Sequence, residues 1–360
     1  MTRDDTLAGV DSRRIETDRL ETHFLETSES DLTTDGGETV VFLHGNVSSS
    51  RFFEDVLLEL PDRHRAIAPD QRGHGDSETK PVDATNGLGD FEADLNALVG
   101  ALDVDEPYVL VGWSIGGGVA MRYAIDHPEA VAALVLINPL SPYGFGGTKD
   151  VDGTPCFDDY AGAGGGTANW EFVSSLQHRV RDGTAAVSPR NILRTYYVDP
   201  THDFDDDREE SYLTGMLDTA TGDENYPGST IESDNWPGTA PGDTGVNNAI
   251  SPKYCRLEEI TGIDPADKPP ITWIRGDTDQ IVSNASLFDV GTLGRMGHLP
   301  EWPGEDVFPP QPMVDQTRAV LETYVDRGGE YEEIVFGNTG HTPHVEVPGD
   351  FLDRLQAVLG

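Results

Sequence analysis

The segment from Tyr108 to Gly118, YVLVGWSIGGG, constrains the fold of this chain more than any other. Its first half is an apolar run typical of a buried strand, and the residues after Ser114 continue with the spacing of a helix. Gly112 and Gly116 flank the serine in the pattern G-x-S-x-G. A serine on a sharp strand-to-helix turn lies in strained backbone, and a side chain two residues away would clash with the crossing strand and helix. The segment therefore predicts a strand, a tight turn that exposes the Ser114 hydroxyl, and a helix.

This turn would also supply groups that stabilise negative charge. The backbone amide of Ile115 and the positive end of the new helix would both point at whatever the serine attacks. The pattern alone is weak evidence, because a chain with 40 glycines produces G-x-S-x-G turns by chance. The apolar strand before Ser114 and the helix after it provide the context that a nucleophile requires. We therefore predict that Ser114 is a nucleophile.

Strands and helices alternate on both sides of this segment. Residues 14–28 predict a β-hairpin, and apolar strands then alternate with amphipathic helices up to about residue 140. Continuous apolar strands of this kind predict a mostly parallel sheet covered on both faces. Residues 141–266 lack the alternation and contain glycine-rich loops with short helical pieces. We predict a core domain made of residues 1–140 and 267–360, with residues 141–266 inserted as a mainly helical lid.

The charge balance excludes several classes of partner. The chain carries 65 acidic and only 24 basic residues, a net charge of -41, and the acids are spread over its whole length. Such a surface repels nucleic acids and anionic membranes, and it is typical of proteins from salt-loving microbes. No apolar run is long enough to span a membrane, and the N-terminus lacks the apolar region of a signal peptide. We therefore expect a cytoplasmic protein without a membrane span.

The two cysteines do not indicate a metal site. Cys156 and Cys255 have no His or Cys partners at the spacing of a zinc site. In a cytoplasmic protein we expect them to be buried thiols, and a disulfide that closes the lid is the alternative.

Candidates for an acid and a base follow two of the later strands. A serine hydroxyl needs a base to remove its proton, and the base needs an acid to fix its tautomer. The segment GDTDQIV at 276–282 follows one apolar strand, and GHTPH at 340–344 follows another. Because the carboxyl ends of parallel strands meet at one edge of the sheet, both segments should lie near Ser114.

Five motifs together resemble one known family. They are HGN at 44–46, DQRGHGDS at 70–77, GWSIGG at 112–117, GDTDQIV at 276–282 and GHTPHVEVP at 340–348. In this order, each at a strand end, they resemble the lid-bearing branch of the α/β-hydrolase fold family, and the likeness covers residues 14–140 and 268–358. The resemblance implies an α/β fold with a doubly wound, mostly parallel sheet.

The resemblance also implies roles for single residues. Ser114 aligns with the nucleophile of the catalytic triad, Asp279 with the acid and His341 with the base, while Asn46 and Ile115 align with the two amides of the oxyanion hole. Four further residues are alternatives with a structural role as the plainer explanation. Asp277 competes with Asp279, His344 competes with His341, and His74 and Asp76 are expected to support their own turn.

The chain departs from the family in one spacing. Asp279 and His341 are 62 positions apart, which is longer than usual, and the excess matches a Gly/Pro-rich loop at 283–312. We expect this loop to lean over the site, and a surface excursion is the alternative. The candidates for pocket lining are His44, Gly45, Trp113, Trp302, Phe308 and Met313.

The type of nucleophile selects the reaction. Haloalkane dehalogenases and epoxide hydrolases of this branch carry Asp on the elbow, so Ser114 argues against both. A serine with a His–Asp pair suits acyl transfer to water, and we expect hydrolysis of a carboxylic ester through an acyl-enzyme. The alternatives are an aminopeptidase of the proline-iminopeptidase type, a carbon–carbon bond (β-diketone) hydrolase, and a hydrolase-fold ligand receptor without activity. We expect a small-molecule acyl substrate, no cofactor and no metal.

The acidic composition generates a prediction about salt. At 0.01 M salt the Debye length is about 30 Å, so carboxylates repel one another across the molecule, and at 1 M it falls to about 3 Å. We expect the midpoint of a thermal melt to rise between 0.05 and 1 M KCl, and to rise about equally in NaCl. A midpoint that is flat or falls with salt would show that the acidic surface is not an adaptation to salt.

Overall fold

The computed structural model describes residues 6–28, 37–61 and 63–360 and is organised around one eight-stranded sheet. The order of the strands across the sheet is β1-β2-β4-β3-β5-β6-β11-β12. Their bounds are β1 Val10–Glu16, β2 Glu21–Thr27, β3 Thr39–Leu43, β4 Arg65–Pro69, β5 Tyr108–Trp113, β6 Val131–Ile137, β11 Ile271–Gly276 and β12 Tyr331–Phe336. The absence of a signal peptide was predicted from the N-terminus, and residues 1–5 of that segment lie outside the described residues.

The sheet is mostly parallel, as the sequence predicted. From β4 to β12 every neighbouring pair is parallel, and only β2 runs against its neighbours, β1 and β4. β1 and β2 form the predicted hairpin, in register from Val10 opposite Thr27 to Glu16 opposite Glu21. The carboxyl ends of β3, β4, β5, β11 and β12 therefore lie along one edge of the sheet, where the five motifs of the sequence are located.

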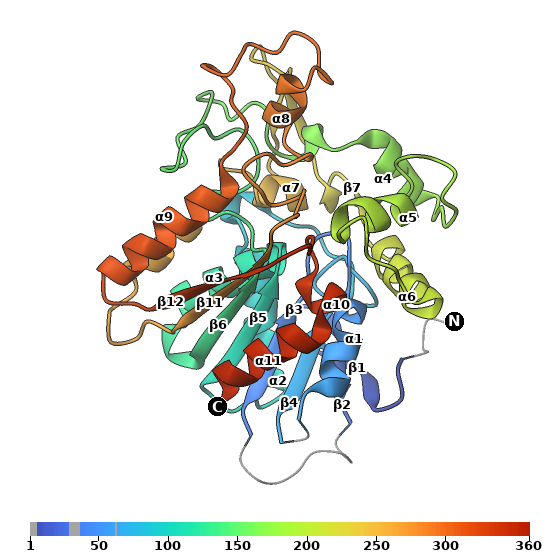
Figure 1. Cartoon of the computed structure of the whole chain (residues 1–360), viewed down its shortest axis with the longest axis vertical. Coiled ribbons are helices and arrows are strands. Elements are labelled where there is room, and N and C mark those ends of the chain that lie inside the picture. The colour runs from blue at the N-terminus through green and yellow to red at the C-terminus, as the bar shows by residue number, and fades with distance from the viewer. Residues whose placement is uncertain (1–5, 29–36, 62) are drawn as a thin grey trace.

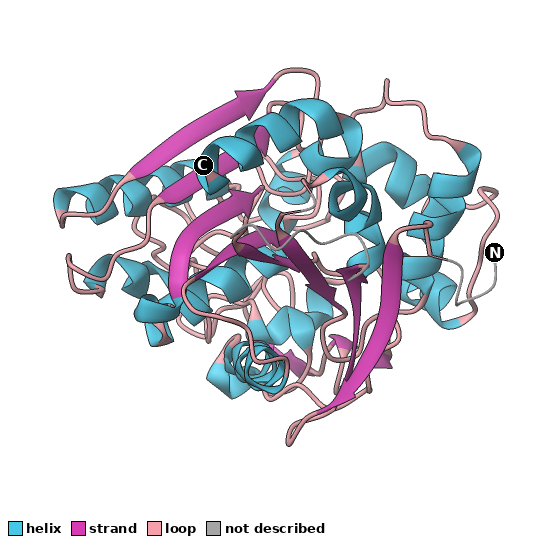
Figure 2. Ribbon diagram, turned by 90° about the horizontal axis from the view of Figure 1, so that it is seen from below, coloured by secondary structure: helices cyan, strands magenta, loops and turns pink. Residues whose placement is uncertain are grey.

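Helices cover both faces of the sheet, and the strands twist between them (Figure 2). Alternate residues of β3 show the two layers, because Val40 and Phe42 pack in one core cluster while Val41 and Leu43 pack in the other. The first cluster includes residues of α1 (Glu54–Glu59) and α11 (Pro348–Leu359), and the second includes residues of α2 (Gly89–Ala101), α3 (Ile115–Asp126) and α9 (Met313–Asp326). Shorter turns are η1 Ser50–Phe53, η2 Ala84–Asn86, η3 Pro128–Ala130, η6 Leu257–Gly262 and α10 Pro343–Glu346.

The segment between β6 and β11 lies above the carboxyl edge of the sheet (Figure 1). It contains helices, as predicted, and also two small β-ribbons that the sequence analysis did not predict. The helices are η4 Gly165–Thr167, α4 Trp170–Gln177, α5 Pro189–Ile192, a π-helical turn Leu193–Tyr197, α6 Asp206–Leu217 and α7 Val246–Ala249. The ribbons pair β7 Thr221–Gly222 with β8 Tyr226–Pro227, and β9 Thr230–Glu232 with β10 Thr239–Pro241.

The loop at 283–312 contains a helix, α8 (Val290–Arg295), that the Gly/Pro-rich sequence did not predict. Asp289 caps it by accepting a hydrogen bond from the Thr292 amide at 3.1 Å. Two of its residues are glycines because the helix lies directly against other parts of the loop. A Cβ on Gly291 would overlap the Pro309 carbonyl, and one on Gly294 would overlap the Trp302 ring. The glycines therefore indicate close packing rather than an irregular loop.

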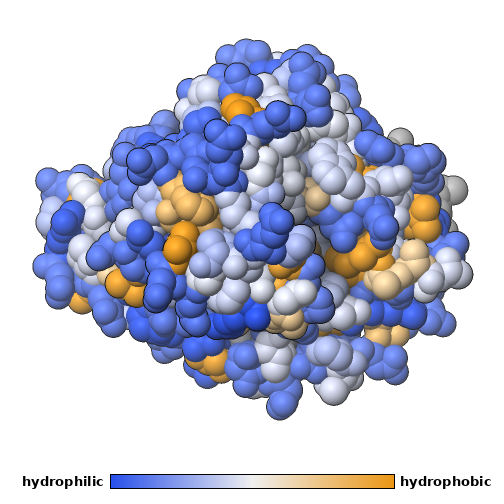
Figure 3. Space-filling model, turned by 90° about the horizontal axis from the view of Figure 1, so that it is seen from above, coloured by the Kyte–Doolittle hydropathy of each residue, from blue (hydrophilic) through white to orange (hydrophobic). Residues whose placement is uncertain are grey.

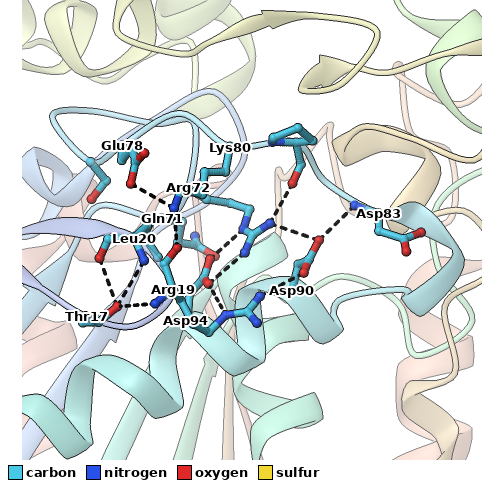
Figure 4. Close-up of polar contacts among 12 residues, drawn as sticks. Thr17, Arg19, Leu20, Gln71, Arg72, Glu78, Lys80, Asp83, Asp90 and Asp94 are labelled. Atoms are coloured by element: carbon cyan, nitrogen blue, oxygen red, sulfur yellow. Dashed lines mark hydrogen bonds and ion pairs between the residues drawn. The ribbon is translucent and has the colours of Figure 1, made fainter.

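A partly buried group of ion pairs links the loop after β4 to helix α2 (Figure 4). Arg72 is only 5% exposed, and its guanidinium donates to both carboxylate oxygens of Asp94 at 2.6 and 2.8 Å. Arg19 donates to Asp94 from the other side at 2.7 Å and to Asp90 at 3.0 Å. Paired donors of this kind offset the cost of burying the carboxylate. The loop with the DQRGHGDS motif is thus held rigidly beside the site.

The surface above the carboxyl edge is mostly hydrophilic, with apolar residues scattered among polar ones (Figure 3). Within the described parts of the chain, no helix has both the length and the apolar character that crossing a membrane requires. Cys156 and Cys255 are both free thiols, and Cys255 is buried.

Candidate active site

Ser114 lies on a strained turn between β5 and α3. Its backbone has φ 56° and ψ -120°, a conformation that residues with side chains rarely adopt. The two glycines of the motif have the steric reason that the sequence predicted. A Cβ on Gly112 would overlap the carbonyl of Gly116, and a Cβ on Gly116 would overlap the carbonyl of Leu43 at the end of β3. Helix α3 can therefore begin directly against the ends of β3 and β5, with Ser114 at its N-terminus.

His341 and Asp279 form a buried hydrogen-bonded pair. The distance from His341 Nδ1 to Asp279 Oδ2 is 2.8 Å, and the two residues are 2% and 7% exposed. The other oxygen of Asp279 accepts hydrogen bonds from the amides of Ile281 at 2.7 Å and Val282 at 3.1 Å. An ionised carboxylate can only accept, so Nδ1 of His341 carries the proton and Nε2 can accept one. The pair has the arrangement that a general base needs.

The alternative residues lie elsewhere. Asp277 is exposed and accepts a hydrogen bond from the Asn338 amide at 2.7 Å, rather than from a histidine. His344 is buried with its ring stacked on Phe53 at 4.7 Å, and neither of its ring nitrogens has a partner among the described residues. Burial lowers the pKa of His344 to about 3, and the neighbouring His341 adds to this effect. His344 is therefore neutral at ordinary pH.

His74 and Asp76 belong to the turn after β4. Asp70 accepts hydrogen bonds from His23 Nδ1 at 2.7 Å and from the amides of Ser50 and Asp76 at 2.8 Å. His74 is buried, and its Nδ1 lies 3.0 Å from the carbonyl of Arg72. Burial lowers the pKa of His74 to about 3, and the nearby His44 also lowers it. These contacts give the turn a structural role, with Asp70 at its centre.

Two contacts that the sequence analysis missed hold the loop that carries His341. The indole of Trp113 donates to the His341 carbonyl at 2.8 Å. The carboxylate of Glu346 accepts from the amides on both sides of His341, at 2.9 Å from Gly340 and 3.2 Å from Thr342. The sequence carried no established signal for this contact, because Glu346 lies four residues after the N-cap Thr342, one more than a capping box requires.

The loop after β3 lies directly against the serine turn. A Cβ on Gly45 would come within 3.2 Å of the Ser114 Cβ, so the glycine permits the close approach. The backbone N–H of Asn46 has no acceptor among the described residues. Ile115 is the first residue of α3, so its N–H has no partner within the helix. Both residues line the same cavity as Ser114, and two free N–H groups can thus stabilise an oxyanion there.

This cavity has a volume of about 340 Å³, near the lower end for small-molecule sites. Ser114 and His341 both line it, without a hydrogen bond between their side chains in the described structure. Its other walls are mostly apolar and come from Leu140, the inserted segment and the 281–293 region. They include Leu140, Phe145, Phe172, Val187, Ile192, Tyr196, Tyr197, Tyr226, Ile250, Ile281, Val282, Leu287, Phe288 and Leu293. Among all the described residues that line the cavity there is no Asp, Glu, Lys or Arg.

The prediction of the pocket residues was wrong, because none of the six expected residues lines the cavity. His44, Gly45, Trp113 and Trp302 are not among the residues that line the cavity, and neither are Phe308 and Met313. Trp113 is fully buried beneath the cavity, because its side chain packs with Phe52 at a ring distance of 5.1 Å. Burial lowers the pKa of His44, whose Nε2 accepts a hydrogen bond from the Gln71 amide at 2.9 Å. Trp302 turns away and donates to the Phe308 carbonyl at 2.9 Å.

The loop beyond Asp279 does lean over the site, with other residues than those expected. Phe288 packs edge-to-face with Tyr196 of the inserted segment at a ring distance of 5.2 Å, and both line the cavity. No group of three or more His, Cys, Asp or Glu side chains in the described residues could hold a metal ion.

Comparisons with known proteins agree on the fold. Residues 38–289 match the family model described as the alpha/beta hydrolase fold. The chain is 39% identical over 104 residues to the cis-3-alkyl-4-alkyloxetan-2-one decarboxylase of Shewanella oneidensis, covering 28% of this chain and 32% of that protein. It is 31% identical over 164 residues to the pimeloyl-[acyl-carrier protein] methyl ester esterase of Nitrosomonas europaea, covering 46% of this chain and 51% of that protein.

These matches span only about a third to a half of each relative. A solved structure, an esterase from Exiguobacterium antarcticum, aligns with 97% of this chain and 99% of its own, with a TM-score of 0.57 and 17% identity. At that identity the likeness concerns the fold alone. The family match covers most of the sheet and the serine turn, and the chain therefore belongs to the α/β-hydrolase fold family.

Proposed function

We propose that this protein is a serine hydrolase that cleaves uncharged carboxylic esters through an acyl-enzyme. The observation that carries the proposal is the 2.8 Å hydrogen bond from His341 to Asp279. The bond orients the His341 imidazole, and His341 lines the same cavity as Ser114. Ser114 Oγ attacks the ester carbonyl while Nε2 of His341 takes its proton. His341 then protonates the leaving alcohol and later activates the water that hydrolyses the acyl-enzyme. The amides of Asn46 and Ile115 stabilise the oxyanion in both steps.

The walls of the cavity support a neutral acyl group. An aminopeptidase has to hold the ammonium group of its substrate, and a buried ammonium needs a carboxylate partner. The described residues that line this cavity include no carboxylate, although the chain as a whole has 65 acidic residues. A substrate with a carboxylate on its acyl part would equally lack a cationic partner. The esterase names among the relatives are consistent with the proposal.

The inserted segment and the acidic surface complete the proposal. Residues 141–266 act as a lid over a core of residues 1–140 and 267–360, because they provide most of the cavity wall opposite Ser114. The net charge of -41 supports a protein of a salt-rich cytoplasm.

An activity screen with acyl substrates of different charge tests the function. In buffered KCl we expect hydrolysis of p-nitrophenyl butyrate, and at least tenfold lower kcat/KM for the p-nitrophenyl monoester of succinic acid and for aminoacyl p-nitroanilides. A fluorophosphonate should label the wild type once, and Ser114→Ala should prevent the labelling. Turnover of β-diketones without turnover of esters would instead favour a carbon–carbon hydrolase, and ligand binding without any turnover would favour a receptor.

The choice between Asp279 and Asp277 as the acid can be tested with the same substitution, Asp to Asn, at both positions. Asp279→Asn should lower kcat by about 10⁴-fold, because an asparagine favours the wrong tautomer of His341. Asp277→Asn removes only an exposed carboxylate and should change kcat less than about threefold. Steady-state kinetics of both variants, with circular dichroism to check folding, decide the assignment. A greater loss in Asp277→Asn would make Asp277 the acid.

The buried His344 gives a pH prediction. Its pKa is lowered in the folded protein, so the unfolded chain binds a proton on this residue at higher pH than the folded one. The stability that neutral His344 contributes is present above pH ~6.5 and is lost progressively toward pH ~3. His344→Phe should therefore keep the hydrolytic activity and reduce the fall in melting temperature between pH 7 and 5. Loss of activity in a folded His344→Phe protein would instead identify His344 as the base.

A further inference from the structure

Two residues of the inserted segment bind Asn46, the residue that follows His-Gly in the loop after β3. The hydroxyl of Tyr197 donates to the Asn46 carbonyl at 3.0 Å. The side-chain amide of Asn46 donates to Asn247 Oδ1 at 3.1 Å. Tyr197 ends the π-helical turn and Asn247 belongs to α7, so the contacts come from positions about 50 residues apart in the segment. Asn46 is thus held from two sides by a part of the chain that lies outside the core sheet.

All polar groups of Asn46 except its backbone N–H have a partner in the described residues. Its side-chain oxygen accepts a hydrogen bond from the Val47 amide at 3.0 Å. The backbone N–H alone is without an acceptor in the described residues. Because Asn46 lines the cavity with Ser114, this N–H is the group available to a substrate oxygen. The Asn46 N–H lies in the Gly45–Asn46 peptide plane, whose carbonyl accepts a hydrogen bond from Ser48 Oγ at 2.7 Å. Tyr197 and Asn247 hold the carbonyl and the side chain of Asn46, so they restrain this residue from the other side of its Cα.

The loop needs such external support. Val47 has φ 47°, a left-handed conformation that is unfavourable for a β-branched residue. Backbone strain of this kind persists only where surrounding contacts hold it. The Tyr197 hydroxyl also lies 3.1 Å from the Val47 carbonyl. One hydroxyl therefore contacts the carbonyl before Val47, which belongs to Asn46, and the carbonyl of Val47 itself. Without the hydroxyl, the loop could relax and turn the Asn46 N–H away.

Tyr197 itself is firmly placed. It is 6% exposed, and burial raises the pKa of its hydroxyl above the ordinary value, so the hydroxyl remains protonated and can donate. Its ring packs edge-on against Trp113 at 5.8 Å and His341 at 6.2 Å. Its backbone carbonyl accepts a hydrogen bond from Thr342 Oγ1 at 2.9 Å. One residue of the inserted segment therefore contacts the serine turn, the histidine loop and the oxyanion loop.

We infer that Tyr197 is a positioning residue that aims the Asn46 amide, so that the inserted segment completes the oxyanion hole. The inference depends on the proposed serine hydrolase function, because an oxyanion forms only if Ser114 attacks a carbonyl. Asn247 acts in the same way with a weaker effect, because it holds only the Asn46 side chain.

The test compares two Tyr→Phe variants, each of which lacks one buried phenolic hydroxyl. Tyr197→Phe removes the hydroxyl that contacts the oxyanion loop. Tyr324→Phe removes a buried hydroxyl that donates to the Pro269 carbonyl at 2.7 Å and does not line the cavity. Loss of a whole oxyanion donor costs about 10²–10³ in kcat, so misalignment of one should cost roughly 10- to 100-fold. We expect this loss of kcat, with little change in KM, in Tyr197→Phe alone, and a smaller loss in Asn247→Ala.

A tetrahedral inhibitor separates positioning from general damage. A trifluoromethyl ketone forms an oxyanion on Ser114, so its affinity should fall in Tyr197→Phe by the same factor as kcat/KM, while Tyr324→Phe binds it like the wild type. Wild-type kcat and inhibitor affinity in Tyr197→Phe would overturn the inference and leave the triad intact. If Tyr197→Phe does not fold, Asn247→Ala with unchanged kcat and inhibitor affinity would overturn it. A wild type that neither turns over esters nor reacts with a fluorophosphonate would remove the proposed function, and this inference with it.

Discussion

The close approach of helix α3 to the ends of β3 and β5 is the contact on which the rest of the site depends. It is possible because Gly116 has no side chain where the Leu43 carbonyl passes, and because Gly45 has none where the Ser114 turn passes. With these groups absent, the first amide of α3 and the free amide of the β3 loop line one cavity. A single methyl group at Gly116 would separate the two loops, so the arrangement of Ser114, Ile115 and Asn46 is a consequence of backbone packing.

The inserted segment does more than cover the sheet. Arg208 of α6 donates to Glu54 at 2.8 Å and to Asp55 at 2.9 Å, which attaches the segment to η1 and α1 directly after the oxyanion loop. Glu54 is almost fully buried, so its contact with Arg208 is shielded from solvent, whereas Asp55 is partly exposed. The amide of Asp199 donates to Glu346 at 2.6 Å, which attaches the segment to the histidine loop as well. Movement of the segment would therefore disturb the loops that carry Asn46 and His341, and not only the entrance to the cavity.

Much of the fold and of the candidate site could be predicted because the relevant signals are local. Ser114, Asp279 and His341 each follow an apolar strand within a few residues, and parallel strands bring their ends together. Tyr197 could not be predicted, because its role depends on contact with a loop about 150 positions earlier. The pocket prediction for Trp113 was wrong because its side chain points into the core beneath the turn. Helix α8 was missed because glycines that permit close packing resemble glycines of a loop.

Under the proposed ester hydrolysis, the uncharged cavity in a strongly acidic protein has a consequence for the fate of the product. Ester hydrolysis leaves a carboxylic acid, which ionises near neutral pH and then finds no cation among the described residues around it. Outside the cavity the net charge of -41 repels the same anion. In dilute buffer this repulsion extends over about 10 Å or more and favours escape, whereas in molar salt it is confined to about 3 Å. Dissociation of the acid then depends on the cavity itself, whose described lining residues include no Lys or Arg that would bind an anion.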